Sequence, residues 1–151
     1  MINIRSVNEI EKLSNACKIV KDTLDMLEEF VQPGITTVVL DKKAESFIRS
    51  NNAEPGFKGL YGYPATLCVS IDNEVVHGLP SNRKLEEGQI LSVDVGSFKD
   101  GFYGDHAKSF AVGKVDEEKQ QLIDITHQCL LDAINNAIPG NHIGDIGRAV
   151  Q

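Results

Sequence analysis

The sequence has few cysteines, no long apolar run and no excess of positive charge. Its three cysteines, Cys17, Cys68 and Cys129, are scattered without a C-x-x-C spacing, so neither a disulfide framework nor a cysteine zinc site is expected. No apolar run in the chain approaches the roughly 20 residues that a membrane helix needs. The net charge of −7 argues against non-specific nucleic-acid binding. We therefore expect neither a membrane nor a nucleic-acid partner.

The N-terminus also lacks the apolar region of a signal peptide, because its first five residues, MINIR, turn polar at once. A cytoplasmic location with reduced thiols is therefore expected. What the sequence does contain is the composition of one globular domain. Hydrophobic residues make up 41% of the chain and charged residues 25%, so an apolar core can form beneath a charged surface.

One pair of helices is predicted near the start of the chain. Ser6 and Glu9 form a capping-box pattern, and apolar residues then recur every three or four positions until Pro33-Gly34. A second helix is capped by Thr36 or Thr37. The positions expected on the inner face of the first helix are Ile10, Leu13, Cys17, Val20, Leu24, Leu27 and Val31. Those expected for the second helix are Leu40, Ala44, Phe47 and Ile48.

A similar series begins again near Asp116. Pro139-Gly140 ends its long helix, and a further helix starts near Ile143. The positions expected on the inner face of the long helix are Leu122, Ile125, Cys129, Ala133 and Ala137. The order of helix, Pro-Gly and helix thus occurs twice. It predicts an internal duplication, with a first pseudo-repeat at 1–113 and the start of a second at 114–151.

Strands are predicted between the two helical regions. Residues 66–71 and 74–77 form a β-rich stretch that ends at Gly78-Leu79-Pro80. Longer strands follow at 90–95 and 102–112. The Asp-Gly dipeptide between the last two strands is a strong hairpin signal, so these strands are expected to pair.

Two aspartates stand within the apolar strands of this hairpin, Asp94 and Asp105. A carboxylate there is costly unless it is paired or bound to a cation. A two-residue loop at Asp100-Gly101 places Asp94 opposite Ala107 and makes Asp105 its diagonal neighbour on the same face. A tighter turn around residues 99–100 places the two aspartates directly opposite each other, and a three-residue loop sends them to opposite faces.

Two carboxylates on one face repel each other and need a proton, a basic partner or a metal. Their oxygens suit hard or borderline divalent ions, and one carboxylate can bridge two such ions. The alternative is an exposed face on which both are solvated or paired with Lys or Arg. A second candidate, His77, is placed at a strand end, where side chains reach ligands. A structural histidine is the alternative there.

Several short motifs follow one another at close spacing. They are Gly62-Tyr63-Pro64, Cys68-Val69-Ser70, Glu74-Val75-Val76-His77-Gly78-Leu79-Pro80, Glu87-Gly88, Val93-Asp94-Val95 and Asp100-Gly101-Phe102-Tyr103-Gly104-Asp105. Each motif is weak alone, but the ordered set is specific. It resembles the bacterial-type (type I) methionine aminopeptidases of the M24 metallopeptidase family, and the similarity runs over essentially the whole chain.

The resemblance implies an α+β, pita-bread fold. Residues 1–151 would form a single incomplete domain, the first half of that fold plus the opening helices of the second half. Asp94 and Asp105 match the two metal-binding aspartates, with Asp105 as the bridging one. His77 matches a catalytic histidine that contacts the substrate, and Tyr63 and Cys68 match residues around the methionine side-chain pocket.

The activity implied by the resemblance is removal of the initiator methionine when the next residue is small. The implied cofactors are two divalent metal ions (Co, Mn, Fe, Zn or Ni), and the implied partners are the N-terminal Met peptides of nascent proteins, with ribosome association left open. The family completes its site with a histidine and two glutamates that these 151 residues do not supply. The chain alone is therefore expected to be inactive, and to expose an apolar face that favours self-association.

Gly96 is a smaller departure, since many members of the family have threonine at this position. Two other functions also stay open. The first is a non-catalytic, truncated pita-bread domain that acts as a binding module; metal content and dependence on a partner distinguish it from the enzyme. The second is a related Xaa-Pro aminopeptidase or prolidase. Those relatives usually carry a separate N-terminal domain and lack the His-Gly-Leu-Pro context.

Overall fold

The computed structural model describes residues 3–151. The chain forms two compact units, of which the first ends at Lys114 and the second comprises Val115–Gln151. This division describes packing and not descent, so the duplication inferred from the sequence stays a prediction. Within the described residues, no helix is long and apolar enough to cross a membrane.

Helix α1 (Val7–Glu28) begins at the predicted capping box. Its buried residues are Ala16, Ile19, Val20, Thr23, Leu24 and Leu27. The predicted inner face is therefore confirmed at Val20, Leu24 and Leu27 but is wrong at Ile10 and Cys17, which are exposed, and the half-buried Val31 lies beyond the end of the helix. The helix does pack on the sheet at this level, but through Ala16, which is fully buried and accepts a hydrogen bond of 2.9 Å from the Ser97 hydroxyl, whereas the adjacent Cys17 lies on another side of the helix.

Helix α2 (Thr37–Ser50) lies beside α1, and its buried residues are Thr37, Leu40, Asp41, Ala44 and Ile48. Three of these are predicted core positions. Phe47 is only half-buried. The buried Asp41 has no counterpart in the apolar pattern, and its role depends on the segment that α2 faces.

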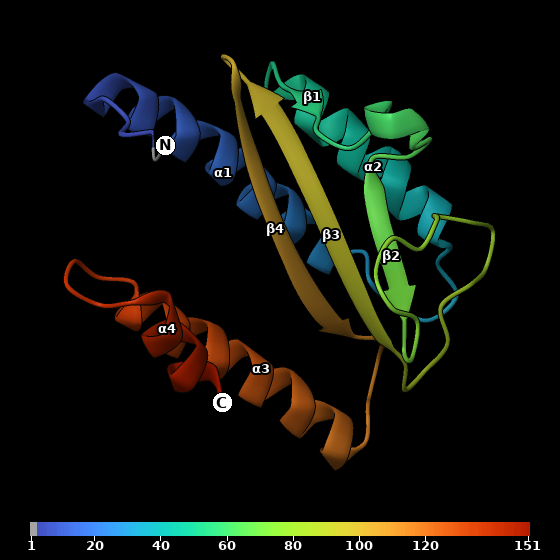
Figure 1. Ribbon diagram of the computed structural model, residues 1–151. Helices are drawn as coiled ribbons and strands as arrows, with labels where there is room; N and C mark the ends of the chain where they lie inside the picture. The colour runs from blue at the N-terminus through green and yellow to red at the C-terminus, as the bar shows by residue number, and fades with distance from the viewer. Residues whose placement is uncertain (1–2) are drawn as a thin grey trace. The chain divides into compact units, whose positions relative to one another are not determined.

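The sheet of the first unit is antiparallel, with β3 (Ile90–Lys99) at its centre. Strand β4 (Phe102–Ala111) pairs along one edge of β3, and β2 (Leu67–Ile71) and the two-residue β1 (Glu54–Pro55) pair along the other. Helices α1 and α2 pack on one face, as Figure 1 shows. The fully buried core residues of β3 are Leu91, Val93 and Val95. The intervening residues Ser92, Asp94 and Gly96 therefore face the other side of the sheet.

Residues 74–77 do not form the predicted strand. They belong to an irregular loop, in which Val76 and His77 have φ values of 23° and 59°, far from extended backbone. Val75 and Val76 are exposed, so burial of their side chains does not stabilise an extended conformation here. The loop rejoins the sheet at Gly78, whose carbonyl accepts a hydrogen bond of 2.9 Å from the Val69 N–H.

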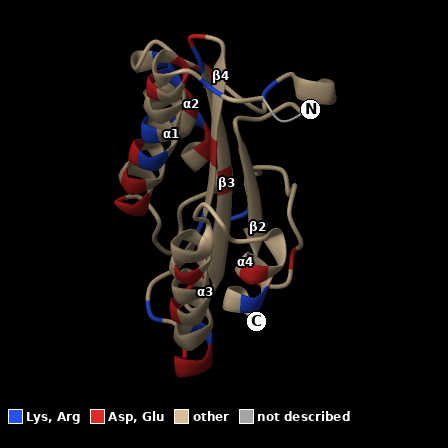
Figure 2. Cartoon of the chain, turned by 60° about the vertical axis from the view of Figure 1, so that its left-hand side comes forward, with Lys and Arg blue, Asp and Glu red and all other residues tan. Residues whose placement is uncertain are grey.

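The second unit consists of α3 (Glu117–Asn136) and α4 (Ile143–Val150). Asp116 caps α3 by accepting a 2.8 Å hydrogen bond from the Lys119 N–H. Figure 2 shows acidic and basic residues distributed along the helices, whereas the strands of the first unit are largely free of them. The predicted inner face of α3 is only partly covered: Cys129 and Ala133 are half-buried, whereas Leu122 and Ile125 are exposed.

Candidate functional site

The hairpin that carries both aspartates has the two-residue loop Asp100-Gly101. Lys99 pairs with Phe102, so only these two residues lie between the strands. Their φ values are 51° and 86°, the left-handed conformation that a type I′ turn requires at both positions. The turn matches the right-handed twist of its strands and therefore fixes the register of the ladder.

This register places both carboxylates on one face. Asp94 pairs with Ala107, and Gly96 pairs with Asp105. Asp105 is therefore the diagonal neighbour of Asp94 on the face that α1 and α2 leave open. Of the three registers that the sequence allowed, the two-residue loop is the one observed.

The electrostatics of this pair are unfavourable for two free carboxylates. Burial raises the pKa of Asp94, and the charge of Asp105 and a hydrogen bond with it raise that pKa further. The neighbouring His77 and the Val95 N–H partly offset the shift. A positive charge between the two side chains would offset the repulsion that raises the pKa of Asp94.

Cys68 and Tyr63 add uncharged polar groups beside the pair. Cys68 lies directly opposite Asp94 in the β2–β3 ladder, and burial raises the pKa of its thiol, with a further contribution from Asp94 and Asp105. Burial likewise raises the pKa of Tyr63. The Tyr63 hydroxyl lies 2.8 Å from the Leu67 carbonyl oxygen and 3.1 Å from that of Gly78, to which it donates. Both side chains are therefore neutral near pH 7.

A single cavity of about 670 Å³ is lined by all five site residues inferred from the sequence: Tyr63, Cys68, His77, Asp94 and Asp105. Its size is within the range of small-ligand sites. The rest of its lining comprises Phe57, Leu60, Tyr61, Gly62, Pro64 and Leu79. Sequence reasoning missed Phe57, Leu60 and Leu79, since their loops carry no helical or strand period. The closely spaced glycines 56, 59 and 62 were the available signal of an irregular wall.

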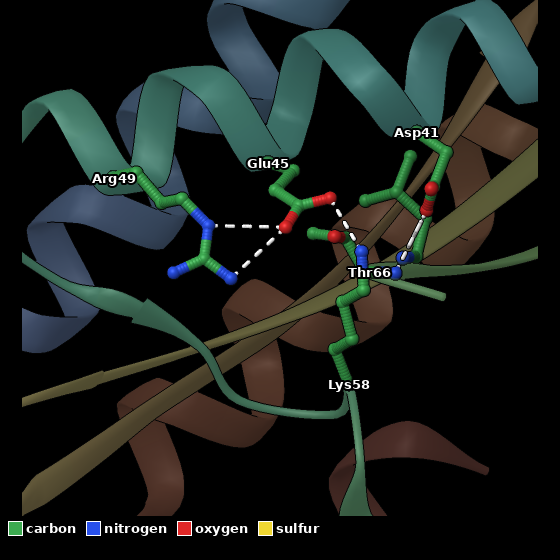
Figure 3. A network of polar contacts seen from close by, with 6 residues as sticks. Asp41, Glu45, Arg49, Lys58 and Thr66 are labelled. Carbon is green, nitrogen blue, oxygen red and sulfur yellow. Dashed lines mark hydrogen bonds and ion pairs between the residues drawn. The ribbon is translucent and has the colours of Figure 1, made fainter. Parts of the chain in front are cut away.

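Helix α2 holds this wall at two points, which Figure 3 shows together. At one end, the Lys58 ammonium lies 2.7 Å from the Glu45 carboxylate, which also accepts from Arg49 at 2.9 and 3.0 Å. At the other end, Asp41 accepts two backbone hydrogen bonds of 2.8 Å, from Thr66 and from the first residue of β2. The cavity wall between these anchors is thereby fixed to the helical layer.

The donor set at the site fits a divalent cation in part. Two carboxylates that repel each other match the hard-oxygen preference of such ions. Within residues 3–151, however, no group of three or more His, Cys, Asp or Glu side chains could hold a metal ion. Asp94 and Asp105 would supply at most two ligands to an ion, and other groups would have to complete its coordination.

Comparison with known proteins gives a consistent family. Residues 11–151 match metallopeptidase family M24. Methionine aminopeptidases of Clostridium perfringens and Clostridium acetobutylicum are 44% and 46% identical to this chain, and each alignment covers 100% of the chain and 61% of the relative. The crystal structure of methionine aminopeptidase from Rickettsia prowazekii has 36% identity and a TM-score of 0.96, covering 100% of this chain and 61% of that one.

The chain therefore spans 61% of the length of these relatives. A prolidase from Pyrococcus furiosus is 21% identical to this chain, with a TM-score of 0.85. The alignment covers 97% of this chain and 42% of the prolidase chain, and it shows a likeness of fold alone. These structures confirm the pita-bread fold expected from the sequence. The match over the whole chain also confirms the resemblance read from the motifs, and the protein belongs to metallopeptidase family M24.

Proposed function

We propose that this chain contributes to a metal-dependent aminopeptidase that removes the N-terminal methionine of nascent proteins in the cytoplasm. One observation carries the proposal. The cavity brings Asp94, Asp105 and His77 together against an apolar wall, in a chain 44–46% identical over its full length to methionine aminopeptidases. The likeness to prolidase is limited to the fold.

Each side chain has a distinct part in this proposal. Asp94 and Asp105 would hold the divalent ions, with Asp105 shared between them. Such ions, when bound, polarise the peptide carbonyl and acidify a water molecule. His77 is exposed on its loop and lines the cavity, so its imidazole can form a hydrogen bond with the scissile amide.

The apolar part of the cavity suits the methionine side chain. A thioether is unbranched and weakly polar, and fills irregular apolar space well. Phe57, Leu60 and Leu79 offer apolar surface, and the protonated Cys68 and Tyr63 add no charge. The wall therefore places no charged group against the side chain of the substrate, apart from the carboxylates at the reacting end.

Residues 1–151 by themselves are proposed to have little or no activity. Two carboxylates attract an ion but do not fix a pair of ions, which needs more ligands. Positioning of reacting groups contributes several powers of ten to rate, so a loosely held ion loses most of that advantage.

The test is cleavage of a Met-Ala-Ser peptide by the 151-residue chain with added Mn²⁺ or Co²⁺, alongside calorimetric titration of Mn²⁺ without peptide. Asp105→Ala is expected to abolish both signals. Asp124→Ala, which removes an exposed aspartate of α3, is the matched control and should leave both unchanged. Equal Mn²⁺ binding by all three proteins would contradict the metal assignment, and cleavage that survives in Asp105→Ala would contradict the proposed mechanism.

A further inference from the structure

Gly96 is the point at which the cavity wall touches the sheet. A Cβ built on Gly96 would lie 2.6 Å from Cε1 and 3.0 Å from Cδ1 of Phe57, well inside the optimal carbon–carbon separation. The three atoms nearest to that position all belong to the Phe57 ring. Gly96 lies within β3, where the backbone is extended and accepts any residue. The ring, and not the backbone, is what requires glycine here.

The contact lies beside both carboxylates. Gly96 follows Asp94 by two residues, so both face the same side of the sheet, and it pairs with Asp105 across the hairpin. Phe57 lines the same cavity as the two aspartates. Its ring therefore occupies the volume that a side chain at position 96 would fill.

Both neighbours of Phe57 are anchored. The Gly56 N–H donates to the Gly96 carbonyl at 2.8 Å, and a Cβ on Gly56 would lie 2.9 Å from the Gly96 carbonyl carbon. Lys58 is tied to Glu45 of α2, as Figure 3 shows. With the loop held on each side of the ring, a larger residue at position 96 would rotate the ring into the cavity before it displaced the loop.

We propose that Phe57 and Gly96 form one steric unit that sets the width of the cavity, and with it the selectivity for the N-terminal side chain of the peptide. The inference rests on the proposed function and adds a specificity-determining pair to it. Glycine at position 96 lets the ring pack against β3 and keeps space for a long, unbranched side chain. A methyl group at position 96 pushes the ring inward and narrows that space, while a short side chain still fits.

The first arm of the test measures thermal unfolding and needs no substrate. Gly96→Ala is expected to lower the unfolding midpoint when Phe57 is present, because the added methyl overpacks the contact. In a Phe57→Ala background, Gly96→Ala is expected to leave the unfolding midpoint unchanged or to raise it, because alanine loses less conformational entropy on folding than glycine does. Gly147→Ala, at a glycine with open space around it, should act alike in both backgrounds. Equal effects of Gly96→Ala in the two backgrounds would overturn the inference.

The second arm measures the affinity of the Mn²⁺-loaded chain for Met-Ala-Ser and Ala-Ala-Ser peptides by calorimetry. Gly96→Ala should weaken Met-Ala-Ser binding about tenfold, the scale of one methylene in an apolar pocket, and should affect Ala-Ala-Ser much less. An unchanged ratio of the two affinities would overturn the inference and leave the proposed function standing. A wild-type chain that binds neither peptide would overturn both.

Discussion

Asp94 and Asp105 are diagonal neighbours across the β3–β4 hairpin, and each faces a residue with little or no side chain. Ala107 stands opposite Asp94, and Gly96 stands opposite Asp105. No side chain larger than a methyl group therefore stands directly across the hairpin from either carboxylate, and the Phe57 ring packs over Gly96. A directly opposed pair would place like charges at the closest cross-strand distance, which is destabilising. The diagonal arrangement avoids that closest approach, yet it keeps the two carboxyl groups near enough to hydrogen-bond and hence to share a cation.

Asp94→Asn is expected to stabilise the metal-free chain and to remove its response to metal. The substitution abolishes the repulsion and desolvation that raise the pKa of Asp94. In EDTA, the unfolding midpoint of the variant should exceed that of the wild type. Saturating Mn²⁺ should then stabilise the wild type alone, by about 2.7 kcal/mol at a concentration one hundred times Kd. A variant that gains as much from Mn²⁺ as the wild type would contradict the assignment.

The same pair predicts a pH dependence of stability in EDTA. Because the folded pKa of Asp94 is raised, the native state retains a proton that the unfolded state releases. The contribution of Asp94 to stability is therefore fully present below its unfolded pKa of about 3.9 and is lost as pH rises through the folded value. The advantage of Asp94→Asn should vanish at low pH and grow toward neutral pH. Urea titrations at several pH values measure it, and a constant difference would contradict the prediction.

Local patterns predicted the elements whose conformation depends on near neighbours. The capping box gave the start of α1, and Asp100-Gly101 gave the hairpin, because a type I′ turn is specified by its own two residues. The strand predicted at residues 74–77 was wrong for the opposite reason. Their valines favour a strand, but the exposed loop that they form is set by contacts at Tyr63 and Gly78. Tertiary contacts overrode β-propensity there.

The candidate site was predicted in the same uneven way. A candidate role for Asp94 and Asp105 in metal binding could be inferred because carboxylates are unusual in apolar strands. Their relative position could not be fixed, because the sequence left three possible hairpin registers. The apolar wall and the two carboxylates of α2 were missed. Asp41 and Glu45 lie on one helix, but their partners are 25 and 13 residues away in sequence, and no local spacing reveals such contacts.

Tyr63→Phe is expected to loosen the loop that carries His77. The Tyr63 hydroxyl donates to the carbonyl oxygens of Leu67 and Gly78, and its loss should cost about 1 kcal/mol, as for a typical intramolecular hydrogen bond. Hydrogen exchange at residues 72–80 should accelerate more than exchange in α1. Tyr103→Phe, at an exposed tyrosine, is the matched control and should leave exchange unchanged. Equal exchange in the loop of both variants would show that the hydroxyl does not hold it.

Asp41→Ala is expected to be among the most destabilising single substitutions in the first unit. It leaves two buried N–H groups without acceptors, each at a cost of about 1–3 kcal/mol. Asp41→Asn should cost less, because both hydrogen bonds reach the same oxygen, Oδ1, which an amide carbonyl can replace. Lys42→Ala, at an exposed neighbour, is the control. Urea unfolding gives the free energies, and an Asn variant as unstable as the Ala variant would contradict this account.

The 151-residue chain is expected to self-associate through its second unit. Leu122 and Ile125 of α3 are 59% and 52% exposed. Because they are three residues apart, they are neighbours on the helix surface and form one exposed apolar patch, which favours association. Sedimentation velocity should show concentration-dependent association at micromolar protein. The double variant Leu122→Lys/Ile125→Lys should shift the chain toward monomer, whereas Val7→Lys, at an exposed apolar residue of α1, should not. A wild-type chain that remains monomeric at all concentrations would contradict the prediction, and an equal shift in both variants would place the contact elsewhere.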